Sequence, residues 1–341
     1  MISRSTALVC CLVLLFVAAA AAQNVRLITK LPESRVDVMV DGKLFTSYRW
    51  DRRIKRPVLY PIIANGGAIV TRGFPFETRD GESIDHPHQV GSSLSYGSVN
   101  GVDFWNTSTF RTAEELKKMG RIEHLAIVST KGGKGSGELI TISAWIGPDG
   151  VIVLKETTKY MFHAQGKTRW IDRVTKLTAV SKAVVFGDSK EGMFAVRVAS
   201  ELEQEDQTGV KVTTVDGTIS ERPVKNFLSG KYFTSEGLYG EKVWGTLGKW
   251  AAVSGKIGTK EVTLAVFDHP KNPNFPSRMM VRGYGLLALN PFGQKLFDAG
   301  KTERSFRLAP HRSITFKHRV LIMSGKMSPT TIARQHSNFI K

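Results

Sequence analysis

Short runs of alternating or β-branched residues recur along almost the whole chain, and this pattern restricts the folds open to it. Asp41-Gly42 separates the runs 36–40 and 44–48, and this pair favours the positive φ angles of a tight hairpin turn. Pro148-Asp149-Gly150 predicts a second hairpin, between 139–146 and 151–157. Further strands are predicted at 170–180, 183–186, 194–198, 242–253, 261–267, 305–308 and 313–323.

Helix signals are few and lie at the margins of this pattern. Residues 112–115 have the sequence of a capping box, which predicts a short helix ending at Met119, before Gly120. Ser328-Pro329 predicts the start of a C-terminal helix with an apolar face. Many strands with few helices indicate an all-β antiparallel architecture, either a large sandwich or a barrel, with short peripheral helices.

The first 22 residues have the features of a secretory signal peptide. Arg4 is their only charge, an apolar run extends from Ala7 to Val17, and alanines lead to a cleavage site expected after Ala22. An uncleaved anchor is the alternative, although the run is short for a membrane span, and no later segment approaches spanning length. We therefore expect a periplasmic or extracellular protein with no integral membrane segment after signal removal. Residues 23–341 are expected to form a single domain, because no clear boundary interrupts them.

Both cysteines, Cys10 and Cys11, lie inside this signal, so the rest of the chain has no thiol for catalysis, disulfides or zinc binding. The formal net charge of +18 suggests an anionic partner, such as a polyanionic glycan or a cell-envelope surface, or serves solubility alone. Nucleic acid is not the expected partner, because the sequence contains no run of five basic residues and no arginine-aromatic ladder.

The tripeptide Asp-His-Pro occurs twice, as 85–87 and as 268–270. Proline restricts its own φ and disfavours helix for the preceding residue, so we expect each histidine to be held on a stiff, extended backbone. The functional interpretation is a pair of preorganised binding loops, and the alternative is ordinary turn capping by the aspartates. We expect the two loops to meet, with His86, His88, Asp103, His269 and Arg282 on one concave surface.

His86 and His88 are two residues apart, a spacing that suits either a metal ion or the grip of a sugar when the backbone is extended. A catalytic metal site needs three protein ligands, and no pattern identifies a third, although Asp103, His124 and His269 are candidates. We therefore expect no bound metal and no cofactor.

Three further acidic residues are candidates for the same site. Asp103 and Trp105 are expected on one strand face, where an indole and a carboxylate suit a carbohydrate, unless they are a turn cap and a core residue. Asp188 and Glu191 suit a general acid and base, and hairpin turn chemistry is the alternative.

Eight blocks, taken together and in this order, resemble the PmoA-like family of exported bacterial proteins of unknown function. Their residues are 56–61, 71–75, 85–88, 99–105, 120–122, 188–192, 267–270 and 290–293. The resemblance implies a large antiparallel β-sandwich similar to the galactose-mutarotase group, whose members bind, epimerise or cleave sugars. The family usually continues Asp-His-Pro-His with His-Arg, whereas this chain has Gln89 and Val90, so a histidine and a cation are missing. The methane monooxygenase activity in the family's label does not fit a chain without an internal membrane span.

We therefore expect a protein that acts on carbohydrate, including an anionic glycan, as a glycoside hydrolase, lyase or epimerase. The alternatives are a glycan-binding module without catalysis and a cell-envelope protein that binds other proteins. The expected catalytic residues are His86, His88, Asp103, Glu191 and His269. The expected substrate-binding residues are Arg72, Trp105, Arg282 and Tyr284.

Overall fold

A computed structural model describes residues 22–341 except 52, 205–210, 214–217 and 222–226. The predicted signal peptide falls almost entirely outside the described residues, so its cleavage remains a prediction. In the described part of the chain, no helix is both long and apolar enough to span a bilayer.

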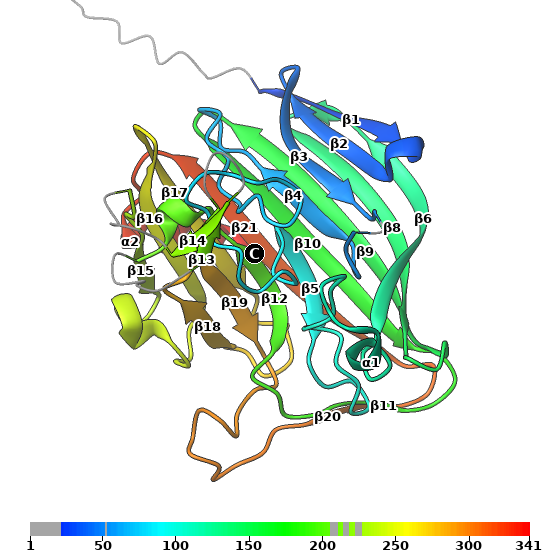
Figure 1. The fold of residues 1–341 in the computed structure, drawn as a ribbon. Helices are drawn as coiled ribbons and strands as arrows, with labels where there is room; N and C mark the ends of the chain where they lie inside the picture. The colour runs from blue at the N-terminus through cyan, green and yellow to red at the C-terminus, as the bar shows by residue number, and fades with distance from the viewer. Residues whose placement is uncertain (1–21, 52, 205–210, 214–217, 222–226) are drawn as a thin grey trace, which may run out of the picture.

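Two antiparallel sheets account for most of the described residues, and they pack face to face as a sandwich (Figure 1). In spatial order, the nine-stranded sheet formed by described residues contains β18 (Arg278–Arg282), β19 (Leu286–Asn290), β12 (Gly192–Arg197), β5 (Ser92–Tyr96), β4 (Val58–Ile62), β3 (Lys43–Arg49), β2 (Arg35–Val40), β1 (Asn24–Lys30) and β7 (Gly133–Lys134). The strand pattern predicted an antiparallel all-β architecture, either a sandwich or a barrel, and the family resemblance implied a large β-sandwich; the β-sandwich is confirmed.

The second sheet contains the longest strands. Over the same described ranges its eight strands are, in spatial order, β15 (Lys231–Thr234), β16 (Trp250–Ile257), β17 (Lys260–Asp268), β21 (Ser313–Ser324), β10 (Thr168–Ala179), β9 (Ile152–Gln165), β8 (Ser136–Ile146) and β6 (Arg121–Lys131). Two small sheets pair β11 (Val184–Phe186) with β20 (Phe306–Leu308), and β13 (Lys211–Thr213) with β14 (Ile219–Glu221).

The main core fills the space between the two large sheets. Val36, Val38 and Phe45 contribute to it from the first sheet, and Phe162 and Leu264 from the second, all with no exposed surface. Alternate residues of β9 are buried, as expected where one face of a strand packs on the core and the other does not. Turn chemistry fixes the register, since Asp41 and Gly42 adopt φ angles of 48° and 75° between β2 and β3.

The helices lie outside the sandwich. Helix α1 (Ala113–Leu116) starts with the predicted capping box but ends before the predicted Met119. Helix α2 (Pro329–Phe339) starts at the predicted Ser328 cap and buries Ile332 against the second sheet. The 3-10 helices are η1 (Leu31–Glu33), η2 (Ser200–Leu202) and η3 (Gly240–Val243).

The strand predicted at 242–253 is wrong for its first eight residues. The structure has η3 and a loop where 242–249 was predicted to be extended, and β16 starts only at Trp250. Gly245 adopts a φ of 72°, and its N–H donates to the carbonyl of Met279, so this loop bends towards β18 instead of continuing β16. The loop covers part of the outer face of the nine-stranded sheet, where a further apolar cluster includes Trp105, Ala195 and Trp244.

Candidate functional site

The first Asp-His-Pro loop connects β4 to β5 and is fastened by buried arginines, among them Arg72. Arg72 has no exposed surface, and its guanidinium donates to the carbonyls of Ser83, Asp85, His86 and Gln89. Because those hydrogen bonds are directed at the loop itself, Arg72 positions the loop. Because its guanidinium is buried, Arg72 is not available for the predicted contact with substrate.

Asp85 lies between two buried guanidinium groups. Its Oδ1 accepts from Arg72 at 2.6 Å and from Arg197, the last residue of β12, at 2.7 Å. Burial alone would raise the pKa of Asp85, but Arg197, the adjacent His86 and Arg72 together hold it well below its usual range. The carboxylate therefore stays ionised at any physiological pH.

His86 is oriented by that carboxylate. Its Nδ1 lies 2.5 Å from Asp85 Oδ2, and because the carboxylate can only accept, Nδ1 carries the proton and Nε2 is left as the basic nitrogen. The side chain is 41% exposed, so a ligand can reach it. The predicted extended backbone at His86 is wrong: its φ is 42°, and its carbonyl accepts from Arg72 and from Gln89 N. A left-handed histidine held by its surroundings is typical of a functional loop.

His88 lies beneath His86, with a distance of 5.7 Å between the ring centroids. It is only 7% exposed, and burial, followed by the field of Arg56, lowers its pKa to about 2. A group that remains neutral at every physiological pH is a poor general acid, which argues against the predicted proton transfer by His88. Its Nδ1 and the Nε1 of Trp105 are buried without a hydrogen-bond partner, and both residues line a small cavity with Arg56 and Gln89.

Tyr284 links this loop to an open cleft of about 360 Å³. It lies in the tight loop between β18 and β19, where Gly285, at a φ of 100°, donates to the Arg282 carbonyl. The ring of Tyr284 stacks on His86 with a centroid distance of 4.9 Å and covers the guanidinium of Arg197 at 4.7 Å. The cleft beside it is lined by Gln204, Glu241, Trp244 and Arg282.

Arg282 supplies the cleft with a positive charge. Its guanidinium lies 3.4 Å from the centroid of the Trp244 ring, and it makes no ion pair with any described carboxylate. A cation held on an aromatic face and left without a counterion is well placed to bind an anionic ligand. The structure thus places the predicted residues His86, Arg282 and Tyr284 around one feature of the surface.

The other predicted acids have local partners. Asp103 caps a turn by accepting from the backbone N–H groups of Trp105 and Asn106, and neither Asp103 nor Trp105 lies in a strand as predicted. Asp188 accepts from three backbone N–H groups of the 294–304 loop. Glu191 pairs with Lys190 at the start of β12. These contacts match the turn-capping interpretation.

The second Asp-His-Pro copy belongs to the other sheet. Asp268 ends β17 and accepts from His269 N, Ser277 N and the side chain of Asn272, so it closes a turn. His269 packs against Phe339 of α2, and burial lowers its pKa to about 4. No contact between the two copies occurs among the described residues, so the structure does not bring His269 to His86.

Three residues of the site were not identified from sequence. Arg197 ends an otherwise apolar strand, and a cation in such a run was a usable signal for a buried ion pair. Trp244 and Glu241 fell in or beside the region wrongly predicted as a strand, where no local pattern marks a cleft. No cluster of three or more potential metal ligands is present among the described residues.

Comparison with known proteins identifies one sequence family. The model of a family described as "Family of unknown function (DUF6807)" matches residues 35–337. That description does not repeat the predicted PmoA-like name, so the resemblance stays a prediction beyond this match. No curated protein matches the chain.

Several solved structures have a related overall shape at low sequence identity. The GH36 α-galactosidase AgaB from Geobacillus stearothermophilus is 12% identical with a TM-score of 0.43, over 88% of this chain and 41% of that one. A galactose mutarotase related enzyme from Lactobacillus acidophilus is 9% identical with a TM-score of 0.30, over 89% and 98% of the two chains. The chain spans about two fifths of the length of the α-galactosidases it matches.

Proposed function

The chain belongs to the DUF6807 family, whose function is unknown, and from that premise we propose that it is a carbohydrate-active protein in which His86 moves a proton on an acidic sugar. The observation that carries this proposal is the exposed His86, oriented by Asp85 and stacked on the Tyr284 that lines a cleft containing the unpaired Arg282. The predicted signal peptide supports a periplasmic or extracellular location, which is part of the same proposal.

The cleft has the mixed surface that sugars require. Trp244 supplies aromatic surface for the C–H face of a pyranose ring, and Gln204 and Glu241 supply polar groups for hydroxyls. Arg282 adds a cation that has no counterion among the described residues, and a planar guanidinium is well matched to a carboxylate. A uronate, the sugar acid of anionic glycans, satisfies both requirements.

Proton abstraction is the reaction that this geometry supports best. With the carboxylate of a uronate neutralised by Arg282, the adjacent C5–H bond becomes more acidic, and the neutral Nε2 of His86 takes its proton. In elimination, the electron pair of the C5–H bond forms the C4=C5 double bond, the C4–O bond breaks, and the imidazolium of His86 gives its proton to the leaving oxygen. In epimerisation, a water molecule delivers a proton to the opposite face of C5, and the imidazolium of His86 releases its own proton to solvent. Both reactions begin with the same step.

Glycoside hydrolysis by two carboxylates is less well supported. That mechanism needs two acids at the scissile bond, one of them protonated or free to attack as a nucleophile. Asp85 is ion-paired to two arginines and serves to orient His86, which leaves Glu241 as the single carboxylate of the cleft lining among the described residues. The geometry therefore favours the lyase and epimerase predictions over the hydrolase prediction.

Isotope exchange tests the shared first step. The protein is incubated with oligouronates in D2O, and NMR detects deuterium at C5, while ultraviolet absorbance detects the conjugated double bond of elimination. We expect exchange with the unaltered protein and a loss of about 100-fold or more in Arg282→Gln, while Arg312→Gln, a change at an exposed arginine, behaves normally. Binding of oligouronates without exchange or elimination would instead identify a non-catalytic glycan-binding module.

A further inference from the structure

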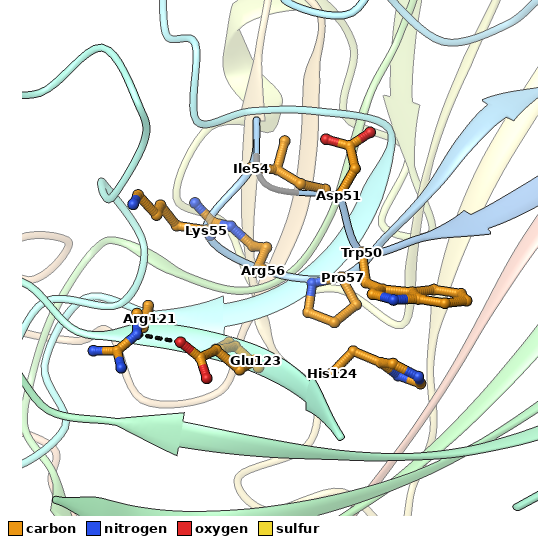
Figure 2. A pocket seen from close by; sticks show the side chains of 10 residues that line it. Trp50, Asp51, Ile54, Lys55, Arg56, Pro57, Arg121, Glu123 and His124 are labelled. Carbon is orange, nitrogen blue, oxygen red and sulfur yellow. Dashed lines mark hydrogen bonds and ion pairs between the residues drawn. The ribbon is translucent and has the colours of Figure 1, made fainter. Parts of the chain in front are cut away.

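A second cleft, of about 460 Å³, lies at the seam between the two large sheets (Figure 2). One wall is formed by Trp50, Asp51 and residues 54–57, between β3 and β4, and the other by Arg121–His124 at the start of β6, the edge strand of the second sheet. None of the residues proposed above to contact the sugar lines this cleft. It is therefore a separate feature of the surface.

The walls of this seam cleft are fixed to each other. Ile122 N donates to the carbonyl of Lys55 at 2.8 Å, which ties the second sheet to the 50–57 segment. Asp51 stabilises the same segment by accepting from Arg49 and from both the backbone and the side chain of Arg53. A cleft whose walls are joined by a backbone hydrogen bond, and one of whose walls is braced by its own ion pairs, needs little rearrangement to receive a ligand.

An aromatic stack forms one end of the seam cleft, as Figure 2 shows. The rings of Trp50 and His124 lie 4.3 Å apart, and Tyr48 contacts both from the core side. Burial lowers the pKa of His124 to about 4, so its ring is neutral at physiological pH. Burial also holds the pKa of Tyr48 well above its usual range, so its hydroxyl keeps its proton, and it lies within hydrogen-bond distance of His124 Nδ1, at 3.0 Å.

Two cations without an ion-pair partner among the described residues distinguish the remainder of the lining, although the field of the Asp103 carboxylate acts on Arg56. Arg56 is buried, and its guanidinium donates to Ser95 Oγ and to the carbonyls of His88, Trp105 and Thr107, all of them neutral. No described carboxylate forms an ion pair with Arg56 or with the neighbouring Lys55. A buried cation surrounded by neutral acceptors favours an anion nearby.

The acidic residues of the lining do not provide that anion. Glu123 pairs with Arg121 at 2.5 Å, as the dashed line in Figure 2 marks, and Asp51 is paired with Arg49 and Arg53. Because Glu123 and Asp51 are already ion-paired with arginines, they do not compensate Lys55 and Arg56, and these two residues leave the lining with a net positive charge. Figure 2 shows Lys55 at the end of the cleft opposite Trp50, so a ligand between them meets an aromatic face and a cation at once.

We propose that the seam cleft is a second binding site, which takes an anionic saccharide with its ring against Trp50 and its acidic group near Lys55 and Arg56. An aromatic ring suits the C–H face of a sugar, and a carboxylate on that sugar compensates the two cations. The site binds without chemistry, because its lining contains no exposed base oriented by a free acid. The inference stands independently of proton transfer at His86.

Binding to the full chain tests this site. Calorimetric titrations at constant ionic strength compare glucuronate with glucose, inorganic sulfate and inorganic phosphate. For Lys55→Met and for Trp50→Ala we expect glucuronate affinity at this site to fall by about ten-fold or more. Lys43→Met, at an exposed lysine of the β2–β3 hairpin, is the matched control and should bind as the unaltered protein does. Melting temperatures near that of the unaltered protein establish that the variants are folded.

A crossed comparison separates this site from the cleft beside Tyr284. Arg282→Gln should leave one glucuronate site intact, and Lys55→Met should leave C5 exchange intact. If Lys55→Met binds glucuronate normally while Arg282→Gln binds none, the seam cleft is not a saccharide site and the inference fails. Equal binding of sulfate, phosphate and glucuronate, unchanged in Trp50→Ala, would likewise overturn it, because it would show a general anion site without sugar recognition.

Discussion

The rings of His86 and Tyr284 stack almost in parallel, with an interplanar angle of 7° and a centroid distance of 4.9 Å. Residues nearly 200 positions apart in the sequence are thus joined at one point of the outer face of the nine-stranded sheet. The stack fixes the plane of the imidazole, while Asp85 fixes its tautomer. Together these contacts hold the one exposed histidine of the first loop beside a cleft that a sugar can enter.

His86→Asn tests whether that imidazole transfers protons. Asparagine tolerates positive φ better than most residues, so the backbone at 86 is retained while the base is lost. We expect C5 exchange or elimination to fall by about 100-fold or more, with sugar affinity within a few-fold of the original. The rates of C5 exchange and elimination are measured in discontinuous assays at saturating oligouronate. The control is His311→Asn, at an exposed histidine that also has a positive φ, of 60°. Unchanged turnover in His86→Asn would remove His86 from the mechanism.

Arg197→Met tests the ion pairs beneath the loop. Removing this guanidinium leaves the buried side of Asp85 with a single cationic partner, Arg72, and breaking a buried pair in this way destabilises a protein by about 3–5 kcal/mol. Urea denaturation of the variant should show that loss. Asp85→Asn in the same background removes the carboxylate as well, so we expect the double variant to lose less than the sum of the two single losses. Strict additivity would show that the pair is not coupled.

Local sequence chemistry predicted much of the fold. The Asp41-Gly42 turn, the capping box at Thr112 and the Ser328 cap each depend on residues close in sequence, and each appears in the structure. The failure at 242–249 has a tertiary cause, because Gly245 N donates to the carbonyl of Met279 in the distant strand β18 and Gly248 N to the carbonyl of Ser277. The strand propensity of a segment does not show which distant strand that segment will bond to.

The site was only partly predictable for the same reason. The sequence identified His86, Arg282 and Tyr284, and it could not show that His88 is buried under them or that Arg72 faces the loop. The two Asp-His-Pro copies look alike in sequence. The copy at 268–270 begins at the end of β17 and packs against α2, whereas the copy at 85–87 lies in the loop between β4 and β5 of the other sheet. Identical tripeptides thus have different roles, set by what packs against them.

Removal of metal should leave the protein unchanged. The prediction rests on the two-residue spacing of His86 and His88, which offers fewer ligands than a catalytic metal site uses. A bound ion would stabilise the native state and would be released as the histidines protonate. We expect no stoichiometric zinc, manganese or calcium by elemental analysis of protein purified without chelator, and no shift of the melting temperature with EDTA. One equivalent of metal that is lost in His86→Ala would contradict this expectation.

Mild acid should destabilise the protein through histidines that are buried in the neutral form. His318 lies between the sheets, stacked on Phe194 with a centroid distance of 4.5 Å, and its pKa is lowered to about 3, chiefly by burial. Between that value and about 6.5 the unfolded chain binds a proton at His318 that the folded chain does not, so the stability that its neutral form provides above about pH 6.5 is lost as the pH falls.

Replacing His318 isolates its share of this effect. His318→Gln removes the titrating group while keeping a polar side chain of similar length, so the fall in unfolding free energy from about pH 7 to about pH 5 should be smaller than in the original protein. His311→Gln, at the surface, should leave the pH dependence unchanged. Urea titrations at several pH values measure both slopes. If the two variants have the same slope as the original, protonation of His318 does not contribute, and the acid sensitivity comes from other histidines whose pKa burial lowers, among them His88, His124 and His269.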